Sequence, residues 1–219
     1  MVAQVKKAQR DMKHLIEENA QLFKENLCNR YVLFGPTDGS HPYETYFPAD
    51  CYFHLCGIQY KNPRQRVSAK KFFQLAVDGR IDPALFSEKY SVYTRQKLGI
   101  LSRLVRIDGF AAKIAPMPTV HFGRTTADLL VYNQDAIMGF RMNYQGPKAY
   151  TPCTALRDHL PKQREEKNIG FVLKTQAESR DYSIQMKPKQ QMSAERASKM
   201  RVSLSLYQGS CTPPLGWKI

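Results

Sequence analysis

The chain has 219 residues, of which 42% are hydrophobic and 24% are charged, a balance typical of a soluble globular protein with one substantial core. Lysine and arginine outnumber aspartate and glutamate by 33 to 19, which gives a formal net charge of +14 at pH 7. This excess predicts a negatively charged partner, and both nucleic acid and an anionic membrane surface fit. No run of about 18 apolar residues and no apolar leader is present, so we expect a cytoplasmic protein without a membrane span.

The first 27 residues have the apolar spacing of an amphipathic helix. The residues that form the stripe are Met12, Leu15, Ile16, Leu22, Phe23 and Leu27. Such a helix either packs back on the domain or pairs with a second copy as a short coiled coil, and the sequence leaves both options open. Residues 31–34 and 43–47 then have the composition of strands, with a turn between them, which predicts a hairpin.

A short aromatic and apolar segment, residues 46–58, contains a single histidine, His54. Pro48 suits the first turn of a helix and Gly57 suits its end, which predicts a short and largely buried helix. A strand of the same length has the same apolar pattern and stays an alternative. In this setting His54 is either a core histidine bonded to a backbone carbonyl or a catalytic group.

The five cysteines are odd in number and scattered, which predicts reduced thiols rather than a disulfide framework. Cys51, His54 and Cys56 are residue types that bind zinc, and on a helix the first two would share a face. Cys56 would point elsewhere, however, and no second ligand pair follows at a suitable spacing. We therefore expect no metal and no cofactor.

The middle of the chain continues with helical patterns. Ser68 is predicted to cap a helix that carries Lys70 and Lys71, and Asp82 followed by Pro83 opens a short helix. A longer helix is predicted over residues 93–107, and the arginines on its polar face are interpreted as solvated.

Strand patterns dominate from residue 119 onward, where four strands are predicted. Their ranges are residues 119–122, 127–132, 136–142 and 169–174. A hydroxyl-rich loop is predicted before the last of them, at Thr151 and Thr154. Helices in the first half and strands in the second predict an α+β fold, with the N-terminal helices packed on one face of an antiparallel β-sheet. The expected division is residues 1–29 as an N-terminal helix, 30–188 as the main domain and 189–219 as a basic tail.

The sequence contains no glycine-rich phosphate loop, no nucleophile elbow and no obvious carboxylate pair. A basic protein of this kind can still cut RNA, because in metal-independent cleavage the ribose hydroxyl is the nucleophile. The protein then supplies a general base, a general acid and cations for the phosphorane. Histidine, lysine, arginine and hydroxyl side chains are sufficient for these roles.

The order of the elements around His54, Lys71, the strand meander and the loop at residues 151–154 resembles a known group. It is similar to phage and mobile-element nuclease domains of the barnase, EndoU, colicin and RelE superfamily, over about residues 31–187. The resemblance implies a metal-independent endoribonuclease or a toxin-like RNA-cleaving domain of a phage or mobile genetic element. RNA is then the expected substrate, DNA a further expected ligand, and an inhibitor protein a partner that the resemblance allows.

Matched residue by residue, the resemblance implies five site residues. They are His54, Lys71, Arg124, Thr151 and Thr154. His54 would be the general base or acid, the two cations would neutralise the phosphate, and the threonines would hydrogen-bond its oxygens or hold the substrate. The alternative from another class is a non-catalytic RNA- or DNA-binding protein that uses the same basic surface. Convergence of these residues in one cleft would favour catalysis.

Overall fold

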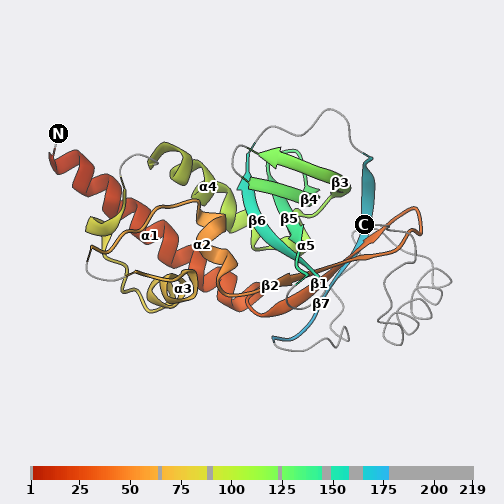
Figure 1. Cartoon of the computed structure of the whole chain (residues 1–219), viewed down its shortest axis with the longest axis horizontal. Coiled ribbons are helices and arrows are strands. Elements are labelled where there is room, and N and C mark those ends of the chain that lie inside the picture. The colour runs from red at the N-terminus through yellow and green to blue at the C-terminus, as the bar shows by residue number, and fades with distance from the viewer. Residues whose placement is uncertain are drawn as a thin grey trace. The chain divides into compact units, whose positions relative to one another are not determined.

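A computed structural model describes residues 2–63, 66–87, 91–122, 125–144, 149–157 and 165–177, which all belong to one compact unit of the chain (Figure 1). The helices are α1 (Val2–Asn26), α2 (Cys51–Cys56), α3 (Ala69–Val77), the 3₁₀ helix η1 (Pro83–Leu85), α4 (Ser91–Leu104) and α5 (Ile107–Phe110). The strands are β1 (Arg30–Pro36), β2 (Tyr43–Phe47), β3 (Lys113–Phe122), β4 (Thr125–Tyr132), β5 (Ile137–Met142), β6 (Tyr150–Leu156) and β7 (Lys167–Lys174).

The seven strands form a closed barrel in the order β1, β2, β6, β5, β4, β3 and β7. Neighbouring strands are antiparallel except β2 and β6, which run parallel and pair at Thr45 and Tyr150. The expectation of an α+β fold is therefore confirmed, whereas the expected purely antiparallel sheet is only partly correct. The barrel closes because β7 pairs with both β1 and β3, so the sheet does not end in open edges there.

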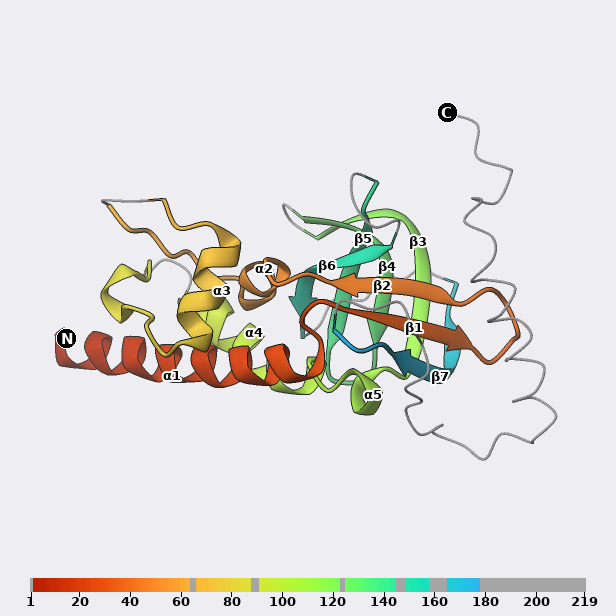
Figure 2. The same ribbon diagram turned by 90° about the horizontal axis from the view of Figure 1, so that it is seen from below.

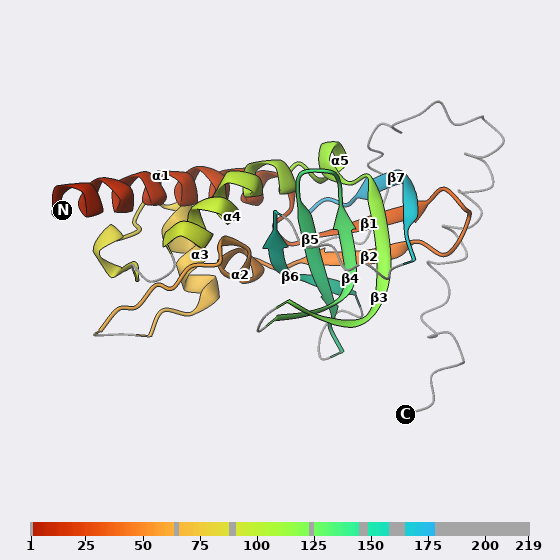
Figure 3. The same ribbon diagram turned by 90° about the horizontal axis from the view of Figure 1, so that it is seen from above.

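Helices α1 to α4 lie together beside the barrel, as Figures 2 and 3 show from two sides. The helices and the inner faces of all seven strands share one hydrophobic core. Helix α1 and the residue that follows it contribute a fully buried stripe at helical spacing, made up of Ile16, Ala20, Phe23 and Leu27. Of the two options open for this helix, the structure shows packing against the same chain.

Helix α2 is anchored by aromatic contacts and by one hydrogen bond from a side chain to the backbone of α1. The hydroxyl of Tyr52 donates to the carbonyl of Ile16 in α1, and the Tyr52 ring lies 5.4 Å from that of Phe23 and 5.3 Å from that of Phe73 in α3. Gly57 ends α2 in the left-handed conformation, as predicted. Ser68 caps helix α3 as predicted, and its hydroxyl accepts a hydrogen bond from the backbone amide of Lys71.

Two strands differ from the sequence-based expectation, and irregular pairing explains both. Strand β3 begins at Lys113 rather than at residue 119, and it accommodates Pro116 at a point where its register with β4 shifts, between Pro116 and Val120. The segment predicted as a loop around Thr154 is instead strand β6. Its pairing with β5 also shifts, so that Cys153 is an extra residue opposite the bond between Gly139 and Phe140.

Replacement of Phe23 by alanine tests the packing of α1. Because this ring is fully buried between helices and strands, we expect Phe23→Ala to lower the free energy of unfolding by about 3–5 kcal/mol. Denaturant unfolding measures the loss, with the exposed Glu18→Ala as control. An unfolding midpoint that depends on protein concentration would instead indicate that α1 is stabilised by a second copy.

Candidate functional site

A lysine from α4 and a threonine from β6 meet beside the end of α2. The ammonium of Lys97 donates to the hydroxyl of Thr154 over 3.4 Å. Thr154 is only 3% exposed, and it fits there because Gly139 on the neighbouring strand has no side chain: a Cβ at Gly139 would lie 2.8 Å from the Thr154 methyl group. The hydroxyl therefore has a fixed place in the barrel wall and holds the lysine head group against it.

The stem of Lys97 passes over Gly57. A Cβ at this glycine would lie 2.5 Å from Cδ of Lys97, and the backbone there has a φ of 61°, which favours glycine. The hydroxyl of Thr94, one turn earlier in α4, donates to the carbonyl of Gly57 over 3.1 Å. The end of α2 thus sets the path of the lysine side chain toward β6.

Lys97 is partly buried, and two thiols lie near its ammonium. Burial lowers the pKa of the Lys97 ammonium, while the nearby thiols of Cys56 and Cys153 oppose that shift. Burial raises the pKa of Cys56 to about 12 and that of Cys153 to about 11, so both thiols are neutral at pH 7. No carboxylate forms an ion pair with Lys97 within the described ranges. A partly buried cation without a counterion is a suitable binding group for an anionic ligand.

His54 lies on the last turn of α2, which ends at the glycine under the Lys97 stem. It is the exposed residue of the six in α2, and its backbone carbonyl accepts the amide of Gly57 over 3.1 Å. The alternative of a buried core histidine is therefore not what the structure shows. No hydrogen bond or ion pair between described residues joins the imidazole to Lys71, Lys97 or Thr154.

The other predicted site residues have separate surroundings. Lys71 is exposed on α3 and lines a pocket that shares no residue with the Lys97 contact. Thr151 donates to the backbone carbonyl of Arg141 on β5 over 3.4 Å. Arg124 lies outside the described residues. Of the five predicted residues, Thr154 is thus the one that contacts Lys97, and His54 lies three residues before Gly57, over which the Lys97 stem passes.

Sequence reasoning missed Lys97 itself. The sequence feature that could have revealed Lys97 is its position on the apolar face of the long helix. It lies four residues before the buried Leu101 and three after the buried Thr94. Lysines are rarely placed on such a face unless their head group has a polar partner. That partner, Thr154, is 57 residues away and comes close only in the folded chain.

Among the described residues, no group of three or more histidine, cysteine or acidic side chains is placed to hold a metal ion. The zinc alternative named Cys51, His54 and Cys56. Both cysteines are buried and His54 is exposed, so these three side chains are not among the groups placed to share a metal ion. None of the helices in the described part of the chain is long and apolar enough to cross a membrane.

Comparison with known proteins defines the class of this chain. A nuclease family model, described as phage-Barnase-EndoU-ColicinE5/D-RelE like nuclease 4, matches residues 15–200. The chain belongs to this family of phage nucleases, which confirms the resemblance inferred from the sequence. Searches of curated proteins and of solved structures find no match. The match includes α2, α4 and β6, so the contact between Lys97 and Thr154 lies inside the nuclease domain.

Replacement of Gly57 by alanine should displace Lys97. The new methyl group would require the lysine stem to move, and we expect its ammonium to reach solvent, where its pKa rises toward the ordinary value of 10.5. The left-handed backbone adds a loss of about 1–2 kcal/mol in stability. The measurement is the pH dependence of Lys97 modification by an amine-reactive reagent, mapped by mass spectrometry.

Gly79→Ala is the matched control. Gly79 also has a left-handed backbone, with a φ of 68°, but a Cβ there meets nothing within 4 Å. The control should lose similar stability and leave the titration of Lys97 unchanged. An equal shift in both variants, or none in Gly57→Ala, would show that Gly57 does not place the lysine.

Proposed function

We propose that this nuclease is a metal-independent endoribonuclease whose cleavage site is built around Lys97 and Thr154. The observation that carries the proposal is the partly buried ammonium of Lys97, fixed by the Thr154 hydroxyl and without a carboxylate partner among the described residues. A fixed cation of this kind is suited to the extra negative charge of a phosphorane. The family match and the net charge of +14 support a nucleic-acid substrate.

The proposed reaction uses the ribose 2′-hydroxyl as the nucleophile. A base removes its proton, the 2′-oxygen bonds to phosphorus, and the bond from phosphorus to the 5′-oxygen breaks as an acid protonates that oxygen. The products are a 2′,3′-cyclic phosphate and a 5′-hydroxyl. In this scheme Lys97 binds a non-bridging phosphate oxygen, and Thr154 positions Lys97.

His54 is the proposed proton-transfer group. Histidine is the side chain that most often transfers protons in enzymes, and it can either accept or donate one. The exposed position on the last turn of α2 supports this role, because the imidazole is accessible to a bound strand without a rearrangement of the core. Lys71, Arg124 and Thr151 remain proposed contacts for phosphate groups farther along the strand.

A non-catalytic nucleic-acid-binding protein is the second candidate. The separation of Lys71 from the Lys97 contact favours it, because several basic positions on different elements are sufficient for binding. The two functions differ in one result, which is whether bound RNA is cut.

Cleavage of RNA in EDTA tests the proposal. We expect purified protein to cut single-stranded RNA and to leave DNA of the same sequence intact, because DNA lacks the 2′-hydroxyl. Lys97→Met should lower kcat on the order of 10²- to 10³-fold, since it removes one fixed charge from the transition state. End analysis of the products should show cyclic phosphate.

Lys7→Met is the control for the loss of one charge, because Lys7 is exposed near the start of α1. It should retain near-parental kcat. RNA binding without any cut in the parent would favour the second candidate, and equal activity of Lys97→Met and parent would remove Lys97 from the site.

Replacement of His54 by alanine tests its proposed part in proton transfer. His54→Ala should reduce cleavage by about 10²- to 10⁴-fold and leave the melting temperature nearly unchanged, because the side chain is exposed. The exposed His41 provides the matched control, and His41→Ala should cleave normally. A variant at His54 that cuts RNA at the parental rate would exclude proton transfer by this residue.

A further inference from the structure

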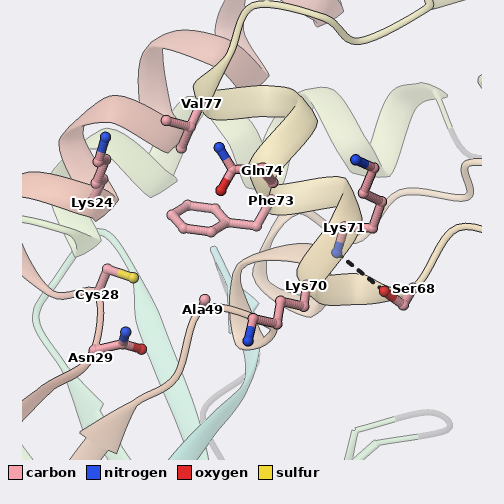
Figure 4. Close-up of a pocket in the computed structure, with 10 residues that line it drawn as sticks. All are labelled: Lys24, Cys28, Asn29, Ala49, Ser68, Lys70, Lys71, Phe73, Gln74 and Val77. Carbon is pink, nitrogen blue, oxygen red and sulfur yellow. Dashed lines mark hydrogen bonds between the residues drawn. The ribbon is translucent and has the colours of Figure 1, made fainter. Parts of the chain in front are cut away.

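A pocket of about 510 Å³ lies between α1 and α3, away from the Lys97 contact (Figure 4). Its lining residues are Lys24, Cys28, Asn29, Ala49, Ser68, Lys70, Lys71, Phe73, Gln74 and Val77. The volume is within the range of sites for small organic molecules, roughly 300–1,000 Å³. Nothing in the chemistry proposed for Lys97 and His54 uses this pocket.

The charge of the pocket is uniformly positive. Lys24, Lys70 and Lys71 line it, no acidic residue does, and none of these lysines forms an ion pair within the described part of the chain. In Figure 4 the Lys70 side chain extends toward Ala49, whereas the ammonium of Lys71 extends away from it. Lys70 and Lys24 line the pocket from two different helices, α3 and α1.

The floor of the pocket is apolar and rigid. Phe73 is only 6% exposed, and its ring is held edge-on against Phe23 at 5.6 Å. Figure 4 shows this ring between Lys24 and Lys70, with Val77 nearby. An apolar floor flanked by two cations is suited to a ligand that has both a phosphate and a flat ring.

We propose that this pocket binds one nucleotide unit of an RNA strand outside the cleavage site, with the phosphates on its two sides held by Lys70 and Lys24 and its base or ribose over Phe73. The inference rests on a nucleic-acid substrate, which the nuclease family supplies, and adds a second contact to it. Three lysines in the pocket account for part of the net charge of +14, which the cleavage site alone does not explain.

The pocket and the cleavage site lie on different sides of α2. This helix packs against α3 on one side and against β6 on the other, as Figure 2 shows. A helix with its side chains is about 10–12 Å wide, roughly three phosphate spacings of a nucleic-acid strand. A dinucleotide bound at Lys97 therefore does not reach the pocket, whereas a longer strand does.

A double variant, Lys24→Met with Lys70→Met, tests the proposal. The probe is a fluorescent single-stranded 2′-O-methyl RNA of about 12 nucleotides, which lacks the nucleophile and fits the roughly 4–16 nucleotides that single-strand sites cover. We expect its affinity to fall on the order of tenfold, and the slope of log affinity against log salt to fall by about 1.4, since each lost phosphate contact contributes about 0.7. Cleavage of a dinucleotide should be unchanged.

Lys6→Met with Lys7→Met is the control, because it removes the same charge from exposed positions outside the pocket. An equal loss of affinity in both double variants would mean that the pocket contributes only general charge, and would overturn the proposal. Since the probe cannot be cut, the binding result stands even if the parent cleaves no RNA. Failure of the pocket and failure of the proposed ribonuclease activity are thereby distinguished.

Discussion

Helix α2 has six residues, and a helix of this length is not stable alone in water because forming its first turn costs more than a few hydrogen bonds return. It persists here because four of its residues are buried against α1, α3, α4 and β6. The hydroxyl of Tyr52 fixes it to α1, and the ring of the same residue joins the aromatic core. The candidate site depends on this packing, since α2 carries His54 and ends at the glycine under Lys97.

The same packing creates an electrostatic cost at Lys97. Because burial lowers the pKa of this ammonium, the unfolded chain holds the proton more tightly than the folded chain. The destabilisation is therefore complete below the lowered pKa and disappears as pH rises toward 10.5. A buried cation that does not stabilise the fold is consistent with a functional role, because an anionic ligand supplies the missing countercharge.

The two basic sites differ in how rigidly they are built. Lys97 is guided along its stem by Gly57 and at its head by Thr154, whereas the pocket lysines extend from exposed helix positions over a fixed aromatic floor. Fixed charge suits a transition state, and adaptable charge suits a strand whose sequence varies. The two proposed roles therefore match the way in which each site is built.

The sequence by itself determined what depends on neighbouring residues. The Ser68 cap, the glycine that ends α2, the stripe of α1 and the first hairpin are all local signals, and the order of these elements was sufficient to identify the nuclease family. Only the tertiary structure decided the closure of the barrel, the strand β6 in place of a loop, and the meeting of Lys97 with Thr154. These features depend on pairing between residues far apart in the chain, and the irregular register around Cys153 hides the usual strand pattern. Lys97 belongs to this second group, because a lysine on an apolar helix face acquires a role only when the partner across the core is known.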